Sequence, residues 1–128
     1  MKYLLLSLGA IFGAMSRYLL SGAISKNVNS LFPYGTLVVN IVGAFVFGIL
    51  FSLLEDFTIP SDLKVFLFVG FLGSFTTFSS YIFEIFSMLK EGEYKLSILY
   101  FLYSNVISLL MFVGGYIIIK YLIKLVWR

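Results

Sequence analysis

Hydrophobic residues form four long runs along the chain, separated by short segments that hold most of the charged residues. Each run is close to the roughly 20 residues that an α-helix needs to cross the hydrocarbon core of a bilayer. The runs cover approximately residues 3–24, 35–54, 63–89 and 96–119. The pattern therefore predicts an all-α integral membrane protein, with four transmembrane helices in a single domain of residues 1–128.

The segments between the runs are polar and predict surface loops. They cover residues 25–34, 55–62 and 90–95, and the first two contain Pro33 and Pro60. No segment is left over for a soluble domain, so any function is expected within or between the spans. The first run also resembles a signal peptide, but it continues past Arg17 and three further runs follow, which favours a spanning helix.

Composition agrees with lipid as the solvent and narrows the possible functions. The chain is 61% hydrophobic and 12% charged, with a mean hydropathy of +1.06, and a soluble domain of this size could not bury so much apolar surface. Cysteine and histidine are absent, which removes thiolate chemistry, the commonest metal ligand and the usual proton shuttle. The chain is therefore not expected to be an enzyme, and its scattered net charge of +3 gives no sign of nucleic-acid binding.

Basic residues are almost evenly divided between the two sides of the predicted membrane protein. With four spans, both termini lie on one side. That side would hold Lys2, Lys64, Lys120, Lys124 and Arg128, and the other would hold Arg17, Lys26, Lys90 and Lys95. The positive-inside rule then favours neither orientation, and a chain that inserts both ways round could pair with an antiparallel copy of itself.

Glycines recur within the spans and predict close helix packing. They are Gly9 and Gly13 in the first span, Gly43 and Gly48 in the second, and Gly114 and Gly115 in the fourth.

Asn40 lies in the middle of the second run, within GTLVVNIVG. An amide without partners is costly in hydrocarbon, so Asn40 must find a hydrogen bond. Two readings are open: a bond between helices, or an amide that lines a pathway.

The third run contains GFLGSFTTFSSY at residues 70–81, which places two glycines and five hydroxyl residues at the centre of a span. Glycine weakens a helix, and Ser and Thr hydroxyls compete with the backbone ladder. We therefore expect a break in the third helix, although a continuous helix with back-bonded hydroxyls is the alternative. Broken helices at membrane depth are typical of ion sites, because freed carbonyls coordinate cations and hydroxyls donate to anions.

Two rings and two charges complete the candidates. Phe78 and Tyr81 lie three residues apart and share a helix face, which by spacing alone is typical of core or lipid-facing rings. Arg17 lies well inside the first span, and Glu84 lies near one turn beyond Tyr81. Either charge could reach the interface, or it could shape the electrostatics of a vestibule that concentrates anions.

These residues together resemble the small fluoride channels called Fluc or CrcB proteins. The resemblance runs through GAIFGAMSRY, PYGTLVVNIVGAFVFG, GFLGSFTTFSSYIFE and YFLYSNVISLLMFVGG, and so covers nearly the whole chain. It implies an antiparallel, dual-topology homodimer in the cell inner membrane, with a structural sodium ion at the dimer centre. By motif position, the backbone carbonyls of Gly73 and Thr76 would hold that sodium.

The resemblance also implies a fluoride pathway. Its residues would be Asn40, Thr77, Phe78, Tyr81, Tyr100 and Ser104. Amide and hydroxyl donors would replace the water around fluoride, while the electropositive edges of the rings would contact it weakly enough for it to leave. The family usually has Phe where this chain has Tyr81, so the contribution of this second ring is open.

The function expected from this resemblance is a passive, fluoride-selective channel that exports fluoride from the cytoplasm and relieves its toxicity. A proton-coupled exporter of organic cations, similar to the small multidrug-resistance transporters, is the alternative. Such a transporter needs an acid in its first span, where this chain has Arg17 and no acid. A non-transporting accessory subunit would leave the hydroxyl cluster unexplained.

Overall fold

The computed structural model describes residues 1–28 and 30–126, and over that part of the chain the regular structure is entirely helical. Four helices are long and apolar enough to cross a membrane. They cover Lys2–Asn27, Tyr34–Asp56, Ser61–Lys90 and Tyr94–Val126. The four predicted spans are thereby confirmed, and each helix extends a few residues beyond its predicted run.

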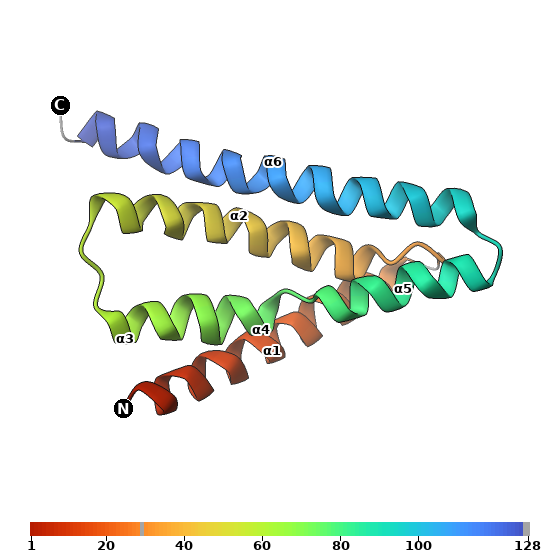
Figure 1. The fold of residues 1–128 in the computed structure, drawn as a ribbon, viewed down its shortest axis with the longest axis horizontal. Helices are drawn as coiled ribbons and strands as arrows, with labels where there is room; N and C mark the ends of the chain where they lie inside the picture. Colours follow the sequence, from red (N-terminus) through yellow and green to blue (C-terminus); the bar gives the residue numbers. More distant parts are fainter. Residues whose placement is uncertain (29, 127–128) are drawn as a thin grey trace.

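The spans lie side by side with both chain termini at the same end of the molecule (Figure 1). Helix α1 (Lys2–Asn27) crosses the third span, while α2 (Tyr34–Asp56) lies between the third span and α6 (Tyr94–Val126). With 33 residues, α6 is about 50 Å long, more than the roughly 30 Å hydrocarbon core requires. Its ends therefore reach beyond the core.

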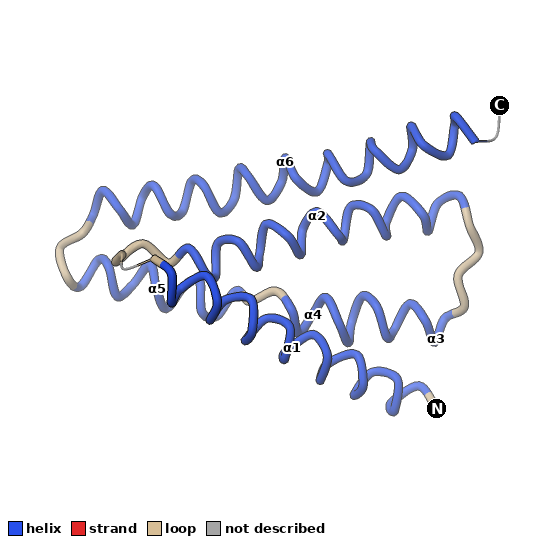
Figure 2. The backbone as a smooth tube through the Cα atoms, turned by 180° about the vertical axis from the view of Figure 1, so that it is seen from behind, coloured by secondary structure: helices blue, strands red, loops and turns tan. Residues whose placement is uncertain are grey.

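The third span is assembled from four consecutive pieces. It consists of α3 (Ser61–Lys64), the π-helix η1 (Val65–Leu72), the short α4 (Gly73–Phe75) and α5 (Phe78–Lys90). Thr76 and Thr77, between α4 and α5, have extended backbone angles (φ −77° and ψ 157°, then φ −145° and ψ 118°). Figure 2 shows this loop within the span. The expected interruption is thus present, three residues after Gly73.

Glycines allow the helices to approach one another closely. A Cβ at Gly48 or Gly115 would overlap the backbone of the facing helix in the α2–α6 pair, and a Cβ at Gly9 or Gly13 would overlap the backbone of η1. Gly43 instead accommodates the methyl group of Thr76 at the break. The predicted packing role is confirmed for these five glycines, whereas an added Cβ at Gly114 would have no neighbour within 4 Å in this single chain.

Candidate functional site

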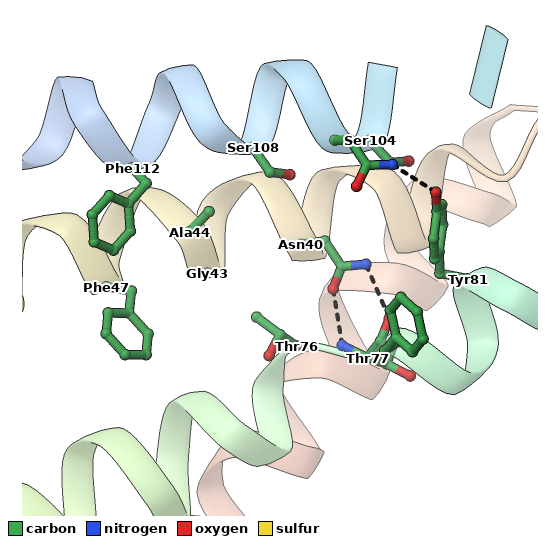
Figure 3. Close-up of a pocket in the computed structure, with 12 residues that line it drawn as sticks. Asn40, Gly43, Ala44, Phe47, Thr76, Thr77, Tyr81, Ser104, Ser108 and Phe112 are labelled. Carbon is green, nitrogen blue, oxygen red and sulfur yellow. Dashed lines mark hydrogen bonds between the residues drawn. The ribbon is translucent and has the colours of Figure 1, made fainter. Parts of the chain in front are cut away.

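The break in the third span is held by one side chain of α2. Asn40 Oδ1 accepts a hydrogen bond of 2.9 Å from the backbone N–H of Thr77, and Asn40 Nδ2 donates one of 3.0 Å to the Thr77 carbonyl (Figure 3). In a continuous helix the Thr77 N–H would donate to the carbonyl of Gly73. Asn40 therefore replaces part of the backbone ladder, and the Gly73 carbonyl loses its regular donor.

Thr77 also begins the second half of the span. Its Oγ1 accepts the backbone N–H of Ser80 at 3.3 Å, which caps the N-terminus of α5. The same oxygen lies 3.0 Å from Ser80 Oγ, to which it donates. On the other side of the break, the hydroxyl of Thr76 bonds back to the Leu72 carbonyl at 3.0 Å. Each threonine thus stabilises one side of the interruption.

An open cavity of about 380 Å³ lies beside the break, between α2, α5 and α6. We call it the α2–α6 cavity. Its polar lining consists of Asn40, Thr76, Thr77, Tyr81, Ser104, Asn105 and Ser108. Its apolar lining consists of Gly43, Ala44, Phe47, Phe78 and Phe112. The cavity thus combines hydrogen-bonding groups with aromatic rings at membrane depth.

Two hydroxyls in this cavity have no protein partner. Ser104 and Ser108 lie one helical turn apart on α6, and their buried Oγ atoms form no hydrogen bond among the described residues. A buried polar atom without a partner is uncommon and needs a physical reason. Both serines line the cavity, so a change of side-chain rotamer would bring either hydroxyl to a ligand or to water there.

Aromatic rings form the wall near the break. The rings of Phe78 and Tyr81 are 5.7 Å apart and tilted by 46°, and Tyr81 packs on Tyr100 at 5.3 Å. Tyr81 is buried, whereas the side chain of Phe78 is 73% exposed. Within this single chain, Phe78 therefore has little packing to support it.

A second cavity, of about 340 Å³, lies between α1, α2 and the start of α5, and we call it the α1–α2 cavity. Arg17 lines it together with Ser21, Thr36, Thr77 and Ser80. Within residues 1–28 and 30–126, Arg17 forms no ion pair. Its positive charge therefore remains available to an anion in this cavity.

Glu84 is partly buried and bonds to two neighbouring helices. Its two oxygens accept hydrogen bonds from the Thr36 hydroxyl at 2.6 Å and from the Tyr100 hydroxyl at 2.7 Å. Tyr100 is completely buried. The carboxylate therefore joins α2, α5 and α6 through two charge-assisted bonds.

Comparison with known proteins places this arrangement in a family. Residues 4–116 match the family model described as CrcB-like protein, Camphor Resistance (CrcB). The chain belongs to the CrcB family. A protein of Legionella pneumophila (strain Lens) is 41% identical over 94% of this chain and 91% of its own length. One of Parabacteroides distasonis is 34% identical over 98% of both chains. Both relatives are named "Fluoride-specific ion channel FluC".

Most residues that the CrcB resemblance singled out lie around one cavity. The α2–α6 cavity is lined by Asn40, Thr76, Thr77, Phe78, Tyr81 and Ser104. Of the others, Tyr100 lies behind Tyr81 and donates to Glu84, which is bonded within the helix bundle. Arg17 lies in the α1–α2 cavity, and Gly73 is exposed beside the break.

Sequence reasoning missed three polar positions of this CrcB chain, and one of them is Ser108, which lines the α2–α6 cavity. Asn105 lines the α2–α6 cavity and donates to the Tyr81 hydroxyl at 2.8 Å. The sequence did point to Asn105, because it is an amide within a long apolar run, as Asn40 is. Thr36 gave a weaker signal, because a hydroxyl near the start of a span has many local uses.

Proposed function

We propose that this chain is a passive, fluoride-selective channel that exports fluoride from the cytoplasm through the cell inner membrane and so relieves fluoride toxicity. It belongs to a family whose similar members are named fluoride-specific ion channels, and it is not an enzyme. Fluoride that enters a cell as its neutral acid ionises inside. The resulting outward gradient drives efflux without an energy source.

The observation that carries the proposal is the pair of buried hydroxyls of Ser104 and Ser108 at the α2–α6 cavity, which have no hydrogen-bond partner among residues 1–28 and 30–126. Fluoride is a small, strongly hydrated anion and a strong hydrogen-bond acceptor, so a pathway must replace its water with donors. These hydroxyls can donate, and the ring edges of Phe78 and Tyr81 carry partial positive charge. Donors with weak ring contacts favour binding that is still easily reversed.

Arg17 supports an anion, and not an organic cation, as the transported ion. It is a cation without an ion-pair partner in the described part of the chain, and it lines a cavity that shares Thr77 with the α2–α6 cavity. A positive charge in a low-dielectric cavity raises the local concentration of anions. An organic-cation pathway would need the opposite charge.

The proposal includes an antiparallel homodimer of dual topology. The α2–α6 cavity is open and Phe78 is largely exposed, so a second copy could complete the wall. The chain contains no cysteine, so Lys26→Cys introduces a single labelling site. Labelling of intact cells with an impermeant maleimide should reach about half of the copies if both orientations occur. Labelling of all copies or of none would exclude dual topology.

The proposal also includes a sodium ion at the centre of the dimer. The Gly73 carbonyl lacks its helical donor, and the extended backbone at Thr76 turns its carbonyl away from the helix direction. Carbonyl oxygens suit hard cations, so these two groups fit as ligands, and a second copy would supply a matching pair. Removal of sodium should abolish flux, and its return should restore it; unchanged flux would exclude the ion.

Efflux from liposomes tests the channel directly. Purified protein is reconstituted into liposomes loaded with fluoride or chloride, and anion release is followed under an imposed potential. Fluoride should leave much faster than chloride. The proposal is lost if fluoride release does not exceed that of protein-free liposomes, or if chloride leaves equally fast. Export is tested by growth in fluoride medium of a bacterium that lacks fluoride efflux, with and without the chain.

A further inference from the structure

Tyr81 carries a hydroxyl at a position where the resemblance leads us to expect phenylalanine. The side chain is 5% exposed, and its ring lines the α2–α6 cavity between Phe78 and Tyr100. The hydroxyl is not left alone there. It accepts a hydrogen bond of 2.8 Å from Asn105 Nδ2, which Figure 3 marks at the Tyr81 oxygen.

The direction of this bond is fixed by a backbone group. Asn105 Nδ2 also lies 2.7 Å from the carbonyl oxygen of Phe101, one turn earlier on α6. A backbone carbonyl can only accept, so the amide nitrogen must be the atom that faces it. The two hydrogens of Nδ2 are then used for Phe101 and for Tyr81. The Tyr81 oxygen is therefore an acceptor in its bond with Asn105.

A phenol that accepts one bond keeps its own hydrogen for another. Over the described residues, the Tyr81 hydroxyl donates to no protein atom. The ring is held in place by its burial and by two aromatic neighbours, so the direction of the C–O bond is fixed as well. The unused hydrogen belongs to a group that lines the same cavity as Ser104.

We infer that Asn105 and Tyr81 form an anion subsite in the α2–α6 cavity, in which Asn105 orients the Tyr81 hydroxyl to donate to fluoride. Tyr81 is the binding group and Asn105 is its positioning residue. The inference rests on the proposed function, since it assigns a specific donor to the fluoride pathway. It predicts that this chain holds fluoride more tightly than a chain with a phenylalanine ring in the same place.

The test is the dependence of fluoride efflux on fluoride concentration, measured in liposomes for Tyr81→Phe, Asn105→Leu and the double variant. Loss of one hydrogen bond to an ion should raise the half-saturating fluoride concentration about ten- to a hundredfold. Since Asn105 acts only through the Tyr81 hydroxyl, the double variant should match Tyr81→Phe. The matched control is Tyr121→Phe, an exposed tyrosine near the end of α6 that lines neither cavity.

The outcomes distinguish a failure of the Tyr81–Asn105 subsite from a failure of the proposed channel function. If the native chain releases no fluoride, the proposed function fails and the inference fails with it. If the native chain conducts and Tyr81→Phe keeps the native half-saturating concentration, only the subsite is overturned. If Tyr81→Phe shifts that concentration and a folded Asn105→Leu does not, or if the two effects add, the positioning role is overturned. Where Asn105→Leu elutes as an aggregate, Asn105→Ala replaces it, because it also removes the amide that bonds Tyr81 and adds neither bulk nor charge to the cavity.

Discussion

The two halves of the third span contact the rest of the molecule in different ways. Before the break, η1 meets α1 backbone to backbone, and Gly13 leaves no room for a side chain against the Phe71 carbonyl. After the break, α5 reaches α2 and α6 through side-chain hydrogen bonds, of Glu84 to Thr36 and of Tyr81 to Asn105. The first half is a packing element, and the second presents side chains to the cavity.

This difference separates two kinds of consequence. Close backbone packing is sensitive to volume, because the facing backbone cannot move aside for an added group. Side chains that line an open cavity contribute less to packing and more to what the cavity binds. Substitutions in the first half should therefore mainly lower stability, and substitutions in the second half should mainly alter ion flux.

The largest expected effect is that of Gly13→Ala on stability. The added Cβ would overlap the backbone carbonyl oxygen of Phe71, so α1 and η1 must separate. We expect a loss of about 2–3 kcal/mol in the free energy of unfolding, as overpacking of a rigid contact costs. The measurement is thermal unfolding in detergent. The same substitution at Gly114, where the Cβ meets nothing within 4 Å, is the control and should be neutral or slightly stabilising. Equal effects at the two positions would contradict the packing role.

Next in size is the effect of Phe78→Ile on flux. The substitution keeps much of the bulk but removes the electropositive ring edge, so fluoride efflux should fall at least about tenfold. The stability of the single chain's own fold should hardly change, because Phe78 is 73% exposed within it. Phe83→Ile is the matched control: it lies on the same helix, is 70% exposed and lines neither cavity. Native flux in the Phe78 variant would mean that this ring only faces lipid. The second half of the third span would then not differ from the first half in its effect on flux.

The sequence predicted the spans because lipid imposes a length and a composition that are local properties of the chain. It also predicted the break, since Gly73 and the clustered hydroxyls weaken a helix wherever they stand. The π-helical form of η1 had no such signal. Its residues are uniformly apolar, so neither their pattern nor their composition marks a π-helix.

The hydrogen-bond partners between helices could not be predicted from the sequence either. Asn40 was expected to need a partner, and Thr77 proved to be that partner through both of its backbone groups. Which groups meet depends on the rotation and depth of neighbouring helices, which one sequence does not specify. Glu84 shows the effect most clearly, because its two bonds come from Thr36 on α2 and Tyr100 on α6, two different helices.

The smallest expected effect concerns the Thr77 hydroxyl, a donor that is already used within the second half of the span. The Thr77 hydroxyl donates to Ser80 Oγ, so its hydrogen is already used and is not free for an anion. Ser80→Ala removes that acceptor while the backbone N–H of residue 80 still caps α5 on Thr77 Oγ1. Stability should therefore change by less than about 0.5 kcal/mol. The freed hydrogen should lower the half-saturating fluoride concentration for efflux about two- to threefold.

The effect of Ser80→Ala is limited because Ser79 Oγ lies 3.4 Å from Thr77 Oγ1 and can accept the freed hydrogen instead. The double variant Ser79→Ala and Ser80→Ala should therefore lower the half-saturating concentration further. Ser87→Ala is the control on the same helix, since that hydroxyl bonds only to the Phe83 carbonyl. An unchanged half-saturating concentration in both the single and the double variant would mean that the Thr77 hydroxyl does not face the ion, and that α5 presents its rings but not its cap to the pathway.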